Sequence, residues 1–542
     1  MNHIRTSGSF ALLLCGLLLL SGCTASPDST PSASSTPTQT NAAVTQTNSS
    51  WFSDRDLDGS YDESQAIDIT LSGSSASCSA DGVTVNGSQV VISAEGIYRL
   101  SGTLEDGQIV INAADTDKVR LVLDGVTIHS ATSAAIYALE ADKVFVTLAD
   151  GSENTLSNGG SYVAIDDNNI DAVIFSKTDL TLNGSGSLTI QAQAGHGVVS
   201  KDELVVTGGS YTVTSASHGM TGKDSVAIAG GVFTITSGKD GIHAENTEDT
   251  TLGALYIAGG SYTIHAQGDA ISASGTLQID GGAFELTTGE GSASVEMSTD
   301  DSFAPGRPGT AVPQETSSTE EDTVSQKGIK GESTYTINGG TFTINSADDC
   351  LHAGGAMVIA AGEFNLSSGD DAVHCDDALT IQSGTFTIPY CYEGIEGLTI
   401  TVEGGTFDIT SHDDGLNAAG GADSSGFGGF GGRPQDTFAS SSDSFITING
   451  GTFTIVSGGD SVDSNGDLTI NGGTLDLTCN GSGDTALDCD GTYTNIGGDV
   501  TTNDGSESNP GGMTGGGGMG GQRPDRGGGQ PPSMPEETAP TA

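Results

Sequence analysis

The chain has 542 residues, of which 82 are glycine, and it carries 70 acidic against 16 basic side chains, a formal net charge of −54. This charge argues against a nucleic-acid-binding protein, because phosphate contacts need clustered Lys and Arg, and against docking on an anionic membrane surface. The glycine content disfavours a helical bundle, since each glycine inside a helix costs about 1 kcal/mol relative to alanine. With 35% hydrophobic residues and β-branched residues at short intervals, the composition favours one long repetitive β architecture.

The first 23 residues have the composition of an export signal. The apolar run over 11–20 is short for a permanent membrane-spanning helix. The sequence Leu-Ser-Gly-Cys at 20–23 resembles a bacterial lipobox and predicts lipidation of Cys23, with an ordinary secretory signal as the alternative. Residues 24–50 are rich in Ser, Thr, Pro, Asn and Gln, which predicts a flexible tether. We therefore expect an extracellular protein anchored to the cell membrane only by the lipid on Cys23.

The organising feature of the chain is a glycine pair followed by a short β-prone run. Such runs begin at Gly208, Gly230, Gly259, Gly281, Gly339, Gly450 and Gly472. The undisturbed repeat is 22 residues, as from 208 to 230, and each unit holds three short strand-like pieces. Such a unit cannot bury a core alone, but stacked coils can, with each strand hydrogen-bonded to its equivalent in the next coil. The sequence therefore predicts an all-β, single-stranded parallel β-helix, right-handed by the general rule for parallel crossovers.

Two long interruptions divide the regular repeats. The segment 289–331 is acidic and rich in Ser, Thr and Pro, and 420–442 is rich in Gly and Phe, so both are predicted to loop out at bends. Residues 51–186 are interpreted as an N-terminal cap with irregular first coils, and 187–500 as the regular β-helix. The tail, 501–542, is rich in Gly and Pro, which predicts disorder.

Acidic side chains recur at fixed offsets from the glycine pairs and predict two columns that run along the stack. The first column contains Asp349, Asp371, Glu393 and Asp414, accompanied by Asp348, Asp370, Asp413 and, in a later coil, Asp460. The second column lies three residues further along each coil and contains His352, His374, Glu396, Asn417, Asp463 and Asp488.

These columns need charge compensation. Adjacent coils lie about 4.8 Å apart, and two unit charges at that distance repel by roughly 3.5 kcal/mol at an effective dielectric of 20. No Lys lies between Glu332 and Ala542, so we expect the compensating cations to come from solution. Carboxylate and amide oxygens favour Ca²⁺, and all the column residues and their Asp neighbours except the histidines are therefore predicted calcium ligands.

Four further side chains, His352, His374, Asp376 and Tyr392, are predicted to contact either metal or sugar. Two alternatives stay open for the columns. The Asp and Asn side chains could cap turns through local hydrogen bonds. The two histidines could favour zinc, although their carboxylate-rich setting suits calcium better.

Several sequence motifs resemble those of a known family. They are Phe52-Ser-Asp-Arg-Asp-Leu57, Val119-Arg-Leu-Val-Leu-Asp-Gly125, Asn154-Thr-Leu-Ser157, Asp179-Leu-Thr-Leu-Asn-Gly-Ser-Gly186, Tyr392-Glu-Gly-Ile-Glu396 and Asp413-Asp-Gly-Leu-Asn417. With these motifs the sequence resembles, over about 51–499, the bacterial cell-surface carbohydrate-binding proteins with a calcium-binding, pectate-lyase-like β-helix. The resemblance implies binding of plant-cell-wall polysaccharide, either polygalacturonate or cellulose, with Ca²⁺ bound to the helix.

Three functions remain open at this point. We favour a noncatalytic polysaccharide-binding lipoprotein that acts as a monomer, with no catalytic residue and no nucleic-acid partner. A polysaccharide lyase of similar fold would need an Arg or Lys base, which the acidic half does not offer, although Lys201, Lys223 and Lys239 lie in earlier coils. An inverting glycoside hydrolase would use one pair of carboxylates, whereas carboxylates repeated in nearly every coil indicate a ladder.

Overall fold

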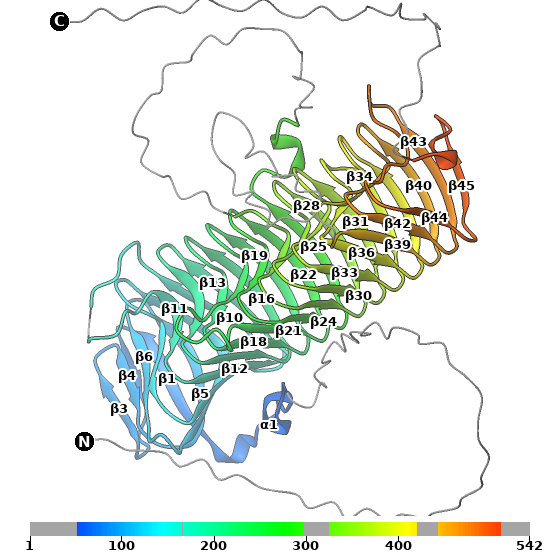
Figure 1. The fold of residues 1–542 in the computed structure, drawn as a ribbon. Coiled ribbons are helices and arrows are strands. Elements are labelled where there is room, and N and C mark those ends of the chain that lie inside the picture. Colours follow the sequence, from blue (N-terminus) through cyan, green and yellow to red (C-terminus); the bar gives the residue numbers. More distant parts are fainter. Residues whose placement is uncertain (1–50, 165, 298–324, 420–442, 511–542) are drawn as a thin grey trace, which may run out of the picture. The chain divides into compact units, whose positions relative to one another are not determined.

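The computed structural model describes residues 51–164, 166–297, 325–419 and 443–510. The predicted signal, the tether and Cys23 lie outside the described residues, as do most of both predicted insertions and most of the tail. Regular structure in the described part is almost entirely β, arranged as stacked coils (Figure 1). No helix in these ranges is long and apolar enough to cross a membrane.

Each regular coil contributes one strand to each of three ladders, here called the first, second and third ladder. The first ladder forms a separate 15-stranded sheet. It consists of β3 (Val83–Asn86), β4 (Gln89–Ile92), β6 (Gln108–Asn112), β8 (Ile136–Glu140), β11 (Ala172–Ser176), β14 (His196–Ser200), β17 (Met220–Gly222), β20 (Ile242–Ala244), β23 (Ile271–Ala273), β26 (Ile329–Gly331), β29 (Leu351–Ala353), β32 (Val373–Cys375), β35 (Ile395–Glu396), β38 (Leu416–Ala418) and β41 (Val462–Ser464). Apart from the β3–β4 hairpin, its neighbours pair in parallel.

The second and third ladders run beside it and are also parallel. The second consists of β9 (Lys143–Leu148), β12 (Asp179–Gly184), β15 (Glu203–Val206), β18 (Ser225–Ile228), β21 (Ala254–Ile257), β24 (Leu277–Ile279), β27 (Tyr335–Ile337), β30 (Met357–Ile359), β33 (Ala378–Ile381), β36 (Thr399–Val402), β39 (Phe445–Ile448), β42 (Asp467–Ile470) and β44 (Tyr493–Asn495). The third consists of β10 (Glu153–Asn158), β13 (Ser187–Ala192), β16 (Ser210–Ser215), β19 (Val232–Ser237), β22 (Ser261–Ala266), β25 (Ala283–Thr288), β28 (Thr341–Ser346), β31 (Glu363–Ser368), β34 (Thr385–Tyr390), β37 (Thr406–Thr410), β40 (Thr452–Ser457), β43 (Thr474–Cys479) and β45 (Asp499–Thr502).

The N-terminal coils join these two ladders into one 30-stranded sheet. The 13-residue strand β7 (Lys118–Ser130) pairs with both β9 and β10. Before it lie β5 (Gly96–Leu104), β1 (Ala66–Gly73) and β2 (Ser75–Ser77), and the short helices are α1 (Asp54–Leu57), η2 (Glu63–Gln65), η3 (Ser292–Ser294) and η4 (Ser506–Ser508). The predicted all-β fold with parallel, stacked strands is confirmed.

The core is a continuous file of inward-facing side chains. In β19 every second residue is buried, as expected for a strand with one face on a core. In-register pairing stacks one aromatic ring per coil, with neighbouring ring centroids 4.4–5.5 Å apart. The stack contains Tyr211, Phe233, Tyr262, Phe284, Phe342, Phe364, Phe386, Phe407 and Phe453.

The glycine pairs lie at the bend before the third ladder. The second glycine of a pair has a positive φ, for example +124° at Gly340, and so has the single glycine at the equivalent place in the next coil, with +150° at Gly362. A Cβ at Gly362 would also lie 2.7 Å from the ring of Phe364, two residues further on. Both the backbone angle and the aromatic stack therefore require glycine at this bend.

The coils absorb extra residues without losing register. Paired residues are 22 apart between Tyr211 and Phe233, but 29 apart between Phe233 and Tyr262 and 58 apart between Phe284 and Phe342. The stack resumes at β26, which lies within the range 289–331 that the sequence analysis assigned to an insertion. It also extends two residues beyond the expected end at 500, because β45 ends at Thr502.

Candidate metal centre in the acidic columns

One column follows the bend that precedes each first-ladder strand, and we call it the turn column. In chain order it contains His218, Asp240, Asp269, Lys327, Asp349, Asp371, Glu393, Asp414 and Asp460. The N–H that follows each of these residues donates to the column carbonyl of the next coil, for example Gly328 N to Asp349 O at 2.8 Å. The predicted stacking of carboxylates is therefore confirmed, and the column begins earlier in the chain than expected.

A second column, which we call the strand column, lies on the first-ladder strands. Strand register places His243, Ser272, Lys330 and His352 one above another, followed by His374, and then pairs Glu396 with Asn417 and Asn417 with Asp463. The bridge between Val462 and Leu487 brings Asp488 beside Asp463. The sequence spacing thus predicted these neighbours correctly from His352 onward.

One oxygen of several turn-column carboxylates caps the next coil. Asp349 Oδ1 accepts the N–H of Asp371 at 3.0 Å, Asp371 Oδ1 accepts that of Glu393 at 3.3 Å, and Asp414 Oδ1 accepts that of Asp460 at 2.6 Å. The turn-capping alternative therefore describes one oxygen of these side chains. The other oxygen of each carboxylate takes no part in this capping bond and is available to a cation.

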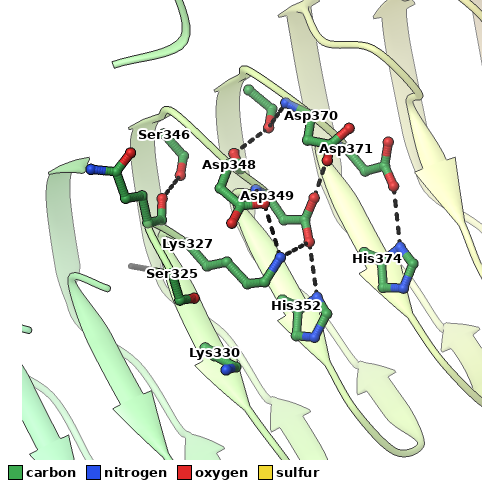
Figure 2. A network of polar contacts seen from close by, with 12 residues as sticks. Ser325, Lys327, Lys330, Ser346, Asp348, Asp349, His352, Asp370, Asp371 and His374 are labelled. Carbon is green, nitrogen blue, oxygen red and sulfur yellow. Dashed lines mark hydrogen bonds and ion pairs between the residues drawn. The ribbon is translucent and has the colours of Figure 1, made fainter. Parts of the chain in front are cut away.

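At the coil of Asp348 and Asp349, the first of the acidic coils predicted from the sequence, that cation is a lysine of the chain itself (Figure 2). Lys327 Nζ lies 2.9 Å from Asp348 Oδ1 and 2.7 Å from Asp349 Oδ2, and all three side chains are buried. Burial would raise the pKa of Asp349, but Lys327 and His352 outweigh it and hold this pKa below its usual value. Burial and the neighbouring Asp349 carboxylate raise the pKa of Asp348. The expectation that no basic residue compensates the columns is wrong for this coil.

The next coil is compensated by a histidine. His374 Nδ1 lies 3.1 Å from Asp371 Oδ2 and 2.8 Å from Glu396 Oε2, and its Nε2 lies 3.0 Å from Asp376 Oδ1. Burial would lower the pKa of His374, but these three carboxylates raise it well above the usual value. The ring stacks on His352 at 5.0 Å between centroids (Figure 2). The three carboxylates thus favour the protonated imidazole at this coil, so zinc would have to displace a proton from His374 in order to bind it.

At the two column positions, the following described coils carry only oxygen ligands. Carboxylate oxygens of Asp460, Asp463 and Asp488 lie within 4.8 Å of one another. Burial and the neighbouring carboxylates raise the pKa of Asp460 to about 7 and that of Asp463 to about 6. For the same reasons, the pKa values of Glu393 and Asp414 lie well above their usual range.

Asn417 provides the test of whether these coils fit a hard cation. Its side chain is 2% exposed, and its Nδ2 donates to Glu393 Oε2 at 2.9 Å. Its Oδ1 is buried and has no hydrogen-bond partner among the described residues. Asn417 pairs in register with Asp463, so a buried amide oxygen without a donor adjoins the carboxylate cluster. Amide and carboxylate oxygens are the ligand set that Ca²⁺ prefers, and the residues present therefore fit it.

The remaining predicted site residues are Asp370, Tyr392 and Asp413, for which the contacts are as follows. Asp370 belongs to the oxygen cluster with Asp348 and Asp349. The Tyr392 N–H donates to Asp370 O at 2.7 Å, and its ring lies 6.3 Å from that of His412. The carbonyl of Asp413 accepts the N–H of Gly459 at 3.0 Å.

Sequence reasoning missed a cluster in the N-terminal half of the columns. Asp240 Oδ2 lies 2.7 Å from His243 Nδ1 and 3.4 Å from His218 Nδ1. Burial would lower the pKa of His243, but Asp240 and Glu245 raise it to about 9. The signal was present, because Asp240 and His243 have the same spacing as Asp371 and His374.

Comparisons with known proteins identify the family of the chain. Residues 86–372 and 370–519 match the family model described as carbohydrate-binding domain-containing protein. The chain belongs to this family. A family member of that description from Acetivibrio thermocellus is 41% identical over 119 residues, which are 22% of this chain and 42% of the relative. The alignment thus spans less than half of that relative's length.

A solved structure is also similar. It is titled the structure of a polysaccharide lyase-like protein from C. thermocellum, gadolinium derivative. It is 37% identical, covers 41% of this chain and 92% of its own, and superposes with a TM-score of 0.41.

Proposed function

We propose that this family member is a noncatalytic, extracellular, lipid-anchored protein that binds a plant-cell-wall polysaccharide, either polygalacturonate or cellulose. The binding surface would be a calcium-loaded, right-handed β-helix with about 22 residues in an uninterrupted coil. The observation that carries the carbohydrate ligand is the family match, which extends over nearly the whole described stack.

A shallow groove along the stack suits a repeating polymer. It has a volume of about 710 Å³ and follows the glycine bends of the third ladder. Its walls present Thr341, Glu363, Thr385 and Thr406, which pair in register from coil to coil and are exposed. Hydroxyl and carboxylate groups repeated at the spacing of the coils can hydrogen-bond successive sugar units.

Calcium would be held where the column positions of neighbouring coils carry only oxygen ligands. Asp460, Asp463 and Asp488 would supply carboxylates, and Asn417 would supply its unpartnered amide oxygen. A bound Ca²⁺ would neutralise part of this acidic surface and could bridge it to the carboxylates of an anionic polysaccharide. These carboxylates would position the ion, and that of Asp460 also caps the next coil by accepting the N–H of Thr485.

Two observations favour binding over lyase chemistry. A lyase base must lose its proton, but Lys327 Nζ donates to two buried carboxylates. Burial would lower the pKa of Lys330, but Glu332, whose Oε1 lies 2.6 Å from Lys330 Nζ, raises it. Both amines are therefore held in their protonated form. Lyase or hydrolase activity remains the alternative that the experiment below addresses.

The test combines binding and product analysis. The purified chain is incubated with insoluble polygalacturonate or cellulose, with Ca²⁺ or with chelator, and the bound fraction is measured. Unsaturated-product absorbance and reducing ends are followed in the same samples. We expect calcium-dependent binding to polygalacturonate without product, and weaker binding by Asp463→Asn but not by the exposed control Asp476→Asn. Growth of either product signal would reject the noncatalytic function, and failure to bind either polymer would reject the carbohydrate ligand.

A further inference from the structure

A second polar pocket lies away from the acidic columns, at the N-terminal cap. It has a volume of about 430 Å³, within the usual range for small-molecule sites, and we call it the cap pocket. Its lining includes Trp51, Arg55, Lys118, Lys143 and Glu203. These residues come from α1 and the segment before it and from the first residues of β7, β9 and β15.

The segment that carries Arg55 is fixed to the sheet. Ser53 and Asp56 form a capping box that closes the single turn of α1. The Asp56 side chain is 2% exposed; its Oδ1 accepts the Thr181 hydroxyl at 2.6 Å and lies 2.8 Å from Lys143 Nζ. The pocket wall is therefore held by buried polar contacts.

Cations gather here in a chain that has few of them. The Phe145 ring has Arg55 Cζ at 5.6 Å, Arg120 Cζ at 5.0 Å and Lys143 Nζ at 5.9 Å from its centroid. Lys118 also lines the pocket and pairs with Asp142. Three cations thus lie around one ring and a fourth lines the same pocket, in a chain with only 16 Lys and Arg among 542 residues.

Not all of these cations are compensated by the protein. Arg120 Nη1 donates to Asp58 O at 3.1 Å and to Thr147 Oγ1 at 2.9 Å, and Lys143 pairs with Asp56. The Arg55 guanidinium has no ion pair with any carboxylate among the described residues, and its ring contact is to Phe145. Its planar fork of donors matches a carboxylate in a bidentate manner.

Trp51 adds an aromatic wall and an unused donor. Its indole stacks on Tyr256 with centroids 5.4 Å apart and planes 12° apart, and the residue is only partly buried. Its Nε1 is buried and has no hydrogen-bond acceptor among the described residues. An indole N–H at a site that is half apolar and half polar normally finds an acceptor.

We propose that the cap pocket is a separate, calcium-independent subsite for one anionic sugar unit, a uronate, and this inference rests on the carbohydrate-binding function proposed above. The sugar carboxylate pairs with Arg55 in the field of Lys118 and Lys143. The sugar ring packs against Trp51, and hydroxyls meet Glu203 and the indole N–H. Binding of a polyanion at the acidic columns thus requires Ca²⁺, whereas binding of a uronate in the cap pocket does not.

The test uses the single tryptophan of the chain as its reporter. The full-length protein in chelator is titrated with trigalacturonate, and Trp51 fluorescence and binding heat are recorded. We expect a saturable change in both signals. Methyl-esterified trigalacturonate and the variant Arg55→Gln should each bind at least roughly tenfold more weakly, since one charge-assisted pair is lost. The control Arg99→Gln removes the same charge from a surface pair with Asp68 and should bind like the parent chain.

The outcomes separate this inference from the proposed function. No fluorescence or heat change in chelator, or equal affinity for the parent chain and Arg55→Gln, would overturn the cap subsite. If polygalacturonate is still captured with Ca²⁺ in that case, the proposed function stands without the subsite. Capture of neither polygalacturonate nor cellulose, with Ca²⁺ or with chelator, would reject both.

Discussion

Replacement of Lys327 by methionine tests whether the turn column depends on its internal ammonium. The substitution keeps the buried aliphatic chain and removes the charge between Asp348 and Asp349, whose side chains are 9% and 0% exposed. Removing one partner of a buried ion pair typically costs about 3–5 kcal/mol, because the other charge stays buried and unpaired.

This free energy can be expressed as a melting temperature. An unfolding entropy of ~2.1 cal/mol/K per residue over roughly 400 folded residues gives about 1 °C per kcal/mol if the stack unfolds cooperatively. We therefore expect Lys327→Met to lower the melting temperature by about 3–5 °C at pH 7 in chelator, measured by calorimetry. Lys223→Met is the matched control, because Lys223 pairs with a Glu248 side chain that is 79% exposed, and it should shift the temperature by less than about 1 °C.

The deficit should also depend on pH with a defined sign. The pKa of Asp349 is lowered in the folded protein, so its contribution to stability is present above the unfolded pKa and is lost as pH falls through the folded value. Without Lys327 this pKa rises, and the deficit should shrink from pH 7 toward pH 4 as the carboxylates take up protons. Equal shifts for the two lysine variants, or a deficit that grows on acidification, would refute the reasoning.

Three further predictions concern the acidic coils and the core. Asp463→Asn should reduce the rise in melting temperature that millimolar Ca²⁺ produces. The same variant should be more stable than the parent chain in chelator, because one of three clustered carboxylates loses its charge. An unchanged Ca²⁺ response in calorimetry would exclude Asp463 as a ligand. The pKa values of about 7 for Asp460 and about 6 for Asp463 exceed the unfolded value near 4, so the metal-free protein should lose stability as pH rises from about 4 to 7. The loss is on the order of 6 kcal/mol if the two groups titrate independently, and a melting temperature that stays flat over this window would contradict the prediction. Phe364→Ala should lower the free energy of unfolding by about 3–5 kcal/mol in denaturant, because Phe364 is 3% exposed between two stacked rings. The control Phe364→Leu should lower it clearly less, and equal losses for the two variants would count against a packed stack.

Spacing alone was sufficient to predict much of the fold and of the strand column. Residues 22 apart, such as His352 and His374, become neighbours whenever a repeat is uninterrupted, so their stacking follows from the period. The aromatic stack follows in the same way from the Tyr or Phe that stands two residues after the bend glycine in most coils.

The internal cation lies one 22-residue repeat before Asp349, so counting back from the acidic column reaches Lys327. It was missed because 327 falls within the range 289–331 that was assigned to an insertion, and because the interval from Asp269 to Lys327 is irregular. The protonation of His374 likewise depends on Asp376 and Glu396 reaching one ring together, which spacing suggests but only side-chain geometry decides. The cap pocket was hidden because it joins Arg55 to strands that lie far along the chain.

The register of the coils has a consequence for how this chain can be altered. Residues beyond the 22-residue repeat fall between consecutive strands: seven more between β20 and β21, and longer segments between β25 and β26 and between β38 and β39. None of them changes which residue follows which in the columns or in the aromatic stack. These connections are therefore natural grafting points, where a foreign loop or a reporter could be inserted while the charge ladder on either side keeps its partners.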